Sequence, residues 1–194
     1  MAAVQQDKDA PDGGQSAHGD HTDPWTIEPV PRGLIDSPLD FIFAEHHRQR
    51  EAATILTMVA DGEFNRRAVT DLIAFLEHDF ALHVGDEELV LFPILRQYCL
   101  PEDDVDRIID RLQGEHRADE ENGEVAIGIL KARLSGRPLM AESSARLRRF
   151  AEHIRQHLGL ENGVLLPIAR VRLEADILEV VAEMLRERRA TRRT

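Results

Sequence analysis

The stretch HVGDEELVLFP, residues 83–93, decides the fold of this chain because HLGLENGVLLP, residues 157–167, repeats its pattern. In both stretches a glutamate follows the histidine after three residues, and a proline follows the glutamate after five. The positions are His83, Glu87 and Pro93 in the first copy, and His157, Glu161 and Pro167 in the second. Side chains four residues apart lie on one face of a helix. Each copy therefore predicts a helix that presents an imidazole and a carboxylate towards one point, and a proline that kinks or ends the helix just beyond the glutamate.

Apolar residues recur at helical spacing along four segments, and the two repeats lie within the second and the fourth. The first segment begins with Ser37 as N-cap and Pro38 in the first turn, and it ends before Gly62. The segments cover about residues 37–60, 65–98, 101–134 and 140–169. No segment shows the period of two that marks a strand, and the links are short. We therefore expect an all-α protein, an antiparallel up-down-up-down four-helix bundle over residues 37–170.

Each expected helix carries one histidine near the middle of its inward apolar stripe. These histidines are His46, His83, His116 and His157, and the second and fourth helices add Glu87 and Glu161 one turn later. Burying these groups without partners would consume much of a stability of about 5 to 15 kcal/mol. A cation removes this cost, because it neutralises carboxylates and accepts imidazole lone pairs. The alternation of a lone histidine with a histidine–glutamate pair predicts two equivalent metal positions, bridged by the two glutamates.

Composition excludes several classes of function. Lys and Arg number 24 against 36 Asp and Glu, which gives a formal charge of −12 and argues against nucleic acid as a partner. No stretch approaches the roughly 18 uninterrupted apolar residues of a membrane span, so we expect no membrane partner. The single cysteine, Cys99, cannot form an internal disulfide, and the N-terminus lacks a secretory signal, so we expect a cytoplasmic protein.

The two ends of the chain differ from the central segments. Residues 1–36 are rich in glycine and proline and predict a flexible, disordered polar tail, in which His18 and His21 are solvated residues. Residues 171–194 predict a short amphipathic helix followed by a basic tail. The apolar face of this helix could serve a homodimer or another protein partner.

Taken together, the segments FAEHHRQR, LHVGDEELVLFP, LQGEHRADEE and HLGLENGVLLPIA resemble the hemerythrin-like (HHE cation-binding) family of bacterial type, over about residues 37–170. The resemblance implies a four-helix bundle with a non-haem di-iron centre, two oxo- or hydroxo-bridged iron ions for which manganese or zinc could substitute. It also implies binding of, or reaction with, O₂, NO or peroxide, with or without enzymatic turnover. The alternative is a metal-storage or metal-sensing module whose occupancy controls a partner interaction. The implied ligands are His46, His83, His116 and His157, with Glu87 and Glu161 as bridging carboxylates.

The third helix departs from the oxygen carriers of that family, which have a second histidine one turn after the first. Here Glu120 holds that position and is included as a candidate metal ligand, although Asp119 fits the same stripe. His47 and His153 stay open as alternative ligands or, for His153, as a donor to one. We expect His78 to be structural or exposed. The glutamates before the lone histidines, Glu45 and Glu115, could orient those imidazoles.

Overall fold

The computed structural model describes residues 23–31 and 33–191, and within them the protein is all-helical, without a strand. The principal helices are α1 (Pro38–Ala60), α2 (Arg66–Ala74), α3 (Ala81–Asp86), α4 (Phe92–Tyr98), α5 (Val105–Leu134), α6 (Ala141–Leu160), α7 (Leu166–Arg172) and α8 (Ala175–Thr191). Three π-helical segments join some of them directly: η2 (Phe75–Phe80), η3 (Glu87–Leu91) and η5 (Glu161–Leu165). Two 3₁₀ turns, η1 (Leu34–Asp36) and η4 (Pro101–Asp103), precede α1 and α5.

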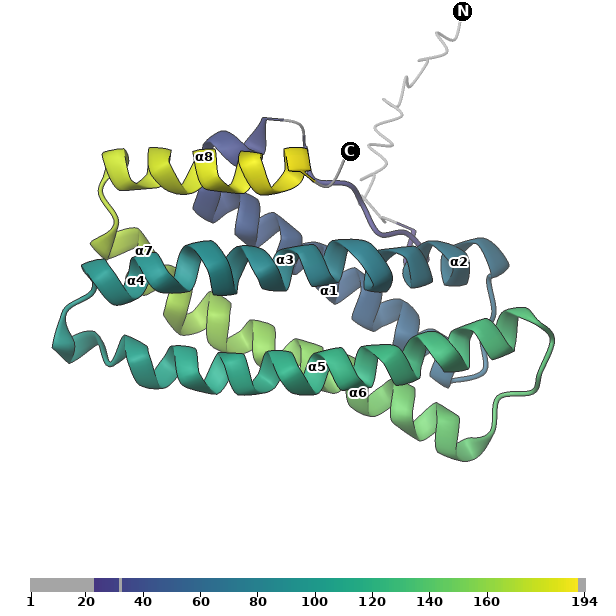
Figure 1. The fold of residues 1–194 in the computed structure, drawn as a ribbon. Coiled ribbons are helices and arrows are strands. Elements are labelled where there is room, and N and C mark those ends of the chain that lie inside the picture. The colour runs from purple at the N-terminus through teal and green to yellow at the C-terminus, as the bar shows by residue number, and fades with distance from the viewer. Residues whose placement is uncertain (1–22, 32, 192–194) are drawn as a thin grey trace, which may run out of the picture.

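Because these segments are continuous, the helices form longer rods that lie side by side (Figure 1). One rod runs from α2 to α4 and another from α6 to α7, while α1 and α5 are single helices. The most extensive packing is between α1 and α6, and α5 packs against both α6 and α2. None of the described helices is both long enough and apolar enough to span a lipid bilayer.

The helix ends lie where the sequence predicts them. Helix α1 begins at Pro38 and ends at Ala60, and the chain then turns through Gly62, whose φ of +97° is one that glycine adopts readily. Asn65 caps α2 by accepting a hydrogen bond from the backbone N–H of Ala68 at 3.2 Å. These local signals set the length of each rod and hence the level at which its histidine lies.

Of the two outcomes predicted for the prolines, a kink or a helix end, the helix end is wrong. The chain remains helical past Pro93 and Pro167, as α4 and α7. Just before each proline the backbone widens into a π turn, in which the N–H of Phe92 donates to the carbonyl of Glu87, and the equivalent bond leads back to Glu161. A π turn takes up one extra residue, and this local adjustment accommodates a residue that has no N–H.

The apolar core is divided into two clusters. The first includes Leu56, Leu72, Leu130 and Leu147, and the second includes Ile42, Leu91, Leu112 and Leu165. Along every rod, the residues of one cluster give way to those of the other close to the inward histidine. On α1, for example, Ile42 belongs to the second cluster and Ala52 to the first, and His46 lies between them. The buried polar side chains therefore form a layer between two apolar halves.

The ends of the chain pack on this bundle. Trp25 and Ile27 lie against the first cluster, while Ile35 lies against the second, so the flexible tail predicted for residues 1–36 is wrong for residues 23–31 and 33–36. The prediction was based on the polar composition of this segment, but its few apolar side chains pack on the core and hold it in place. Residues 1–22, with His18 and His21, lie outside the described residues. Helix α8 buries Val181 and Leu185 in the second cluster.

Candidate metal centre

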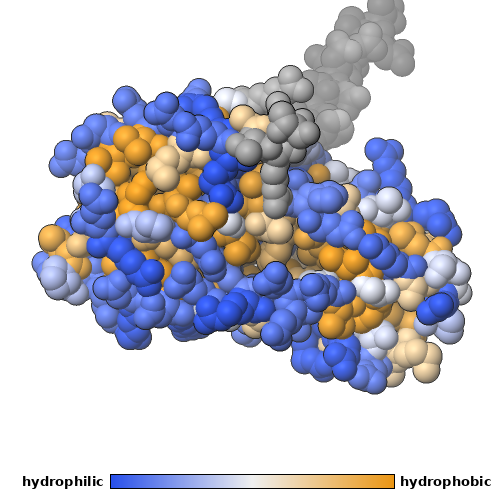
Figure 2. All heavy atoms as spheres, in the orientation of Figure 1, coloured by the Kyte–Doolittle hydropathy of each residue, from blue (hydrophilic) through white to orange (hydrophobic). Residues whose placement is uncertain are grey.

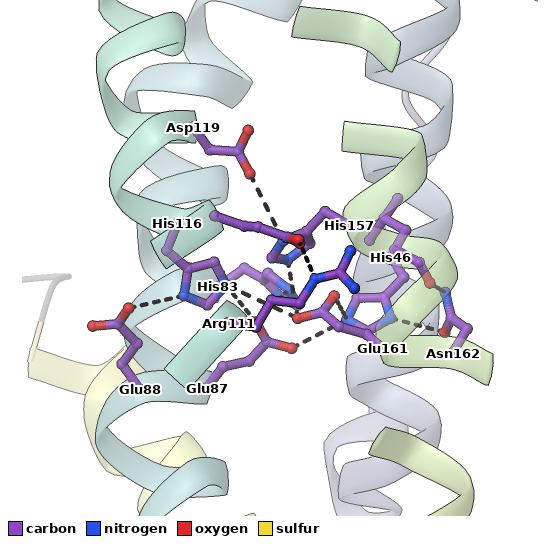
Figure 3. A network of polar contacts seen from close by, with 12 residues as sticks. His46, His83, Glu87, Glu88, Arg111, His116, Asp119, His157, Glu161 and Asn162 are labelled. Atoms are coloured by element: carbon purple, nitrogen blue, oxygen red, sulfur yellow. Dashed lines mark hydrogen bonds and ion pairs between the residues drawn. The ribbon is translucent and has the colours of Figure 1, made fainter. Parts of the chain in front are cut away.

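Six side chains from all four rods converge at the polar layer (Figure 3). Within the described residues they form two groups of candidate metal ligands whose ligand atoms all lie within 4.8 Å of one another. One group is His46, His83, Glu87 and Glu161, and the other is His116, His157, Glu87 and Glu161. Both glutamates belong to both groups, which is the arrangement that two bridged metal positions require.

The Glu87 carboxylate faces imidazoles from three rods. Its Oε1 lies 3.2 Å from His46 Nε2, while its Oε2 lies 3.4 Å from His83 Nε2 and 3.3 Å from His116 Nε2. The pair His83 and Glu87 has the i, i+4 spacing of the repeat. One carboxylate thus reaches both groups, with a different oxygen directed at His46 than at His116.

The Glu161 carboxylate, on the opposite rod, also faces imidazoles of both ligand groups. Its Oε1 lies 3.0 Å from His157 Nε2 and 3.9 Å from His116 Nε2, and its Oε2 lies 3.3 Å from His46 Nε2. The two copies of the sequence repeat therefore supply equivalent groups on facing rods. This is the convergence that the repeat predicts.

Burial makes these contacts costly without a cation. All six residues are at most 3% exposed. Several of their polar atoms lack a hydrogen-bond partner among the described residues: His83 Nδ1 and Nε2, Glu87 Oε2, His116 Nε2, and both oxygens of Glu161. Unpartnered buried polar atoms are rare and destabilising in folded proteins. Imidazole nitrogens and carboxylate oxygens that converge without partners are a donor set for a transition metal ion, so the residues present fit such an ion.

The pKa values of the converging residues also indicate that positive charge stabilises the two buried carboxylates. Burial lowers the pKa of His83, but the carboxylates of Glu87, Glu161 and Glu45 together outweigh burial and raise it to about 9. His157 likewise has a pKa of about 9, raised against burial by Glu161. Burial opposes the ionised form of Glu87, yet the surrounding imidazoles hold its pKa well below the ordinary value. Protons on the imidazoles thus balance the carboxylates, and a bound cation would take over that role.

Two imidazoles are oriented by hydrogen bonds on their outer nitrogens. His46 Nδ1–H donates to Asn162 Oδ1 at 2.8 Å, and His116 Nδ1–H donates to Glu88 Oε1 at 2.8 Å. With Nδ1 protonated, the Nε2 lone pair is free to face the centre. Neither partner was predicted from the sequence, although each directly follows Glu87 or Glu161 in the chain.

A second set of carboxylates lies behind His157. Its Nδ1 is 3.3 Å from Glu115 Oε2 and 3.9 Å from Asp119 Oδ2. Glu115 therefore approaches the imidazole of His157, on the facing rod, and not that of its neighbour His116. His153 belongs to neither group, but its Nδ1 lies 2.5 Å from Asp119 Oδ1. It therefore reaches the centre only through Asp119.

The remaining candidates belong to neither ligand group. Glu120 is exposed and belongs to neither group, because the helix turns by about 100° per residue and puts the buried Asp119 on the inward face instead. The side chain of His47 is 68% exposed and pairs with Glu51 at 3.6 Å. Glu45 accepts from Arg48 Nη1 at 3.0 Å. His78 is exposed, as expected.

Comparison with known proteins agrees with this geometry. A family model described as the Hemerythrin HHE cation binding domain matches residues 37–169, which contain all six converging side chains. No curated protein matches the chain. The matched range covers well over half of the sequence and spans the four rods. The chain therefore belongs to the hemerythrin family, as an HHE cation-binding domain protein.

Proposed function

We propose that this protein is a non-haem di-iron hemerythrin, built on an antiparallel up-down-up-down four-helix bundle, which binds or reacts with O₂, NO or peroxide. The observation that carries the proposal is the sharing of two buried carboxylates between two ligand groups. His46 and His83 would hold one iron, His116 and His157 the other, and Glu87 and Glu161 would bridge them. Manganese or zinc could occupy the same donor set. When bound, an iron pair supplies redox chemistry and positions for a small ligand.

The protein's own residues fix the ligands and keep water out. Asn162 and Glu88 hold two imidazoles in place through their Nδ1 atoms. The ring of Phe92 stacks on His116 with the ring centroids 5.7 Å apart, so one side of this imidazole is closed by an apolar wall. Phe80 and Phe150, which contact each other edge to face, belong to the first cluster on the other side of the polar layer.

Addition of azide and of peroxide to the iron-loaded protein tests this function. We expect a charge-transfer band in the near-ultraviolet before addition and a new absorption band for each adduct afterwards. Protein that contains no metal after expression in iron-replete medium would contradict the proposal.

One observation favours the alternative function of metal storage or sensing. Helix α8 places Arg188 and Arg189 against Asp86, the buried residue directly before the bridging Glu87. Occupancy of the centre could therefore be transmitted to α8 and to a partner that contacts it. Tightly held metal that forms no adduct with azide or peroxide would favour this alternative. The cytoplasmic location expected from the sequence stays a prediction.

A further inference from the structure

A pocket of about 410 Å³ lies between the η2–η3 part of its rod and α5, and His116 of the second ligand group is part of its lining. Its walls include the apolar side chains of Leu76, Phe80, Val84 and Ile127. Its inner end is formed by His116 and Asp119, which are 3% and 1% exposed. Figure 3 shows both residues on the same helix beside the converging ligands. The pocket thus extends from the surface to His116, one residue of the second ligand group.

The rim of this pocket is acidic. Its described lining includes five carboxylates, those of Glu77, Glu88, Asp119, Glu120 and Glu124, and one guanidinium, that of Arg117. Glu77 pairs with Lys131, Glu88 with His116 and Asp119 with His153, so their charges are partly balanced. Glu120 and Glu124 are exposed and lie one turn apart on α5. Figure 2 shows hydrophilic residues interspersed with hydrophobic patches along this helix. Carboxylates around a concave apolar passage focus a negative potential there.

The buried end of the pocket adjoins His116, whose Nε2 faces Glu87 and Glu161. His116 is buried, its Nδ1 is held by Glu88, and its Nε2 has no hydrogen-bond partner within the described part of the chain. A molecule that moves along the pocket therefore arrives at an imidazole of the proposed centre. Phe92 covers one face of the same ring, which leaves the pocket as an approach from another side.

We propose that this pocket is the entry route to the metal centre and that its acidic rim selects neutral small molecules over anions. NO, O₂ and hydrogen peroxide carry no charge at neutral pH and enter freely, whereas azide and other small anions are repelled. The proposal rests on the proposed function, since it assigns the class of ligand that reaches that centre. It also gives Glu120 a role at the rim of the route, away from the ligand groups.

Association rates of a neutral and an anionic probe test the selection. The iron-loaded full chain is mixed rapidly with NO or with azide, and the wild type is compared with the double variant Glu120→Gln/Glu124→Gln. At low ionic strength we expect azide to bind the variant about threefold faster or more, because electrostatic steering changes association rates by factors of about 10 or greater. The NO rate should not change. Added salt should accelerate azide binding to the wild type more than to the variant.

A matched control removes the same charge elsewhere. Glu179 and Glu183 are also exposed and one turn apart, but they lie on α8, outside the pocket lining. Glu179→Gln/Glu183→Gln should leave the azide rate at the wild-type value. Equal azide rates in all three proteins, or the same acceleration in the control, would overturn the selective entry route while the proposed function stands. Absence of any adduct in every protein would overturn the proposed function and this route with it.

A steric variant tests the route independently of charge. Ala81 is exposed and lies on the pocket wall. Ala81→Trp should fill part of the pocket and slow both NO and azide severalfold, with an unchanged iron content. If both rates stay at the wild-type values, the ligands enter elsewhere and the proposal is wrong.

Discussion

At the scale of single residues, the i, i+4 repeat predicted His83, Glu87, His157 and Glu161, because this spacing reports which residues share one helix face. The inward apolar stripes predicted the other two converging residues, His46 and His116. Neither pattern could predict Asn162 or Glu88. Each follows a glutamate that begins a π turn, and a π turn changes the direction of the next side chain relative to a regular helix. Asp119 and Glu120 are adjacent in the chain, and the spacing of the apolar residues on this helix is too coarse to show which of the two faces inward.

The hydrogen bond from His46 to Asn162 gives a prediction at this scale. Asn162→Leu keeps the approximate size of the side chain but removes the acceptor, so His46 loses the bond that orients its ring. We expect metal affinity to fall about 10- to 100-fold, as for other residues that orient metal ligands. Competition with a chelator measures the affinity. Asn162→Asp, which keeps an acceptor oxygen, is the control, and equal losses in both variants would show that orientation is not the cause.

At the scale of elements, capping residues and turn glycines allowed the rod ends to be predicted, since they act within a few residues of the chain. The outcome at the prolines could not be predicted from the same signals. Pro93 lies in a rod held by neighbouring rods on both sides of the site, and the chain adopts a π turn there and continues as α4. Tertiary packing decided between a helix end and a widened turn, and the packing is not encoded locally.

The docking of α8 gives a prediction for an element. Asp86 is 1% exposed, and both of its oxygens contact α8, through Arg188 and Arg189. Arg188→Gln/Arg189→Gln leaves this buried carboxylate without its cations, which costs about 3–5 kcal/mol in comparable sites. Urea unfolding should show a loss of that order. Gly85 also belongs to this contact, because a Cβ there would lie 2.3 Å from Arg188 Nη2.

Arg186→Gln is the control for α8. Arg186 pairs with Asp36, whose side chain is 69% exposed, and surface pairs of this kind contribute about 0–1 kcal/mol. If the double variant unfolds at the same urea concentration as this control, α8 is held by its apolar face alone.

At the scale of the whole molecule, the fold encloses a charged layer between two apolar clusters, and its stability should therefore depend on what neutralises that layer. In the metal-free protein, His83 and His157 have pKa values of about 9, above the ordinary value of 6.5. Groups whose pKa is higher in the folded state stabilise it below pH 6.5, and the contribution is lost as pH rises towards and through 9.

This difference predicts opposite pH responses of the two forms of the protein. Chelator-treated protein should require less urea to unfold at pH 9 than at pH 6.5. The metal-loaded protein should lose less stability over the same range, because deprotonated imidazoles bind metal better. Unfolding midpoints at the two pH values measure both effects. A metal-free form that is equally stable at both values would contradict the assignment of charge to this layer.

The central claim is that the whole bundle holds two metal ions between shared carboxylates, and the metal-to-protein ratio of the purified chain tests it most directly. We expect about two ions per chain in the wild type, with a lower ratio and a lower melting temperature for Glu87→Ala or Glu161→Ala. His47→Ala, next to a proposed ligand but 68% exposed on its side chain, should keep the wild-type ratio. A wild-type ratio of one or zero, or an equal loss in His47→Ala, would contradict the account.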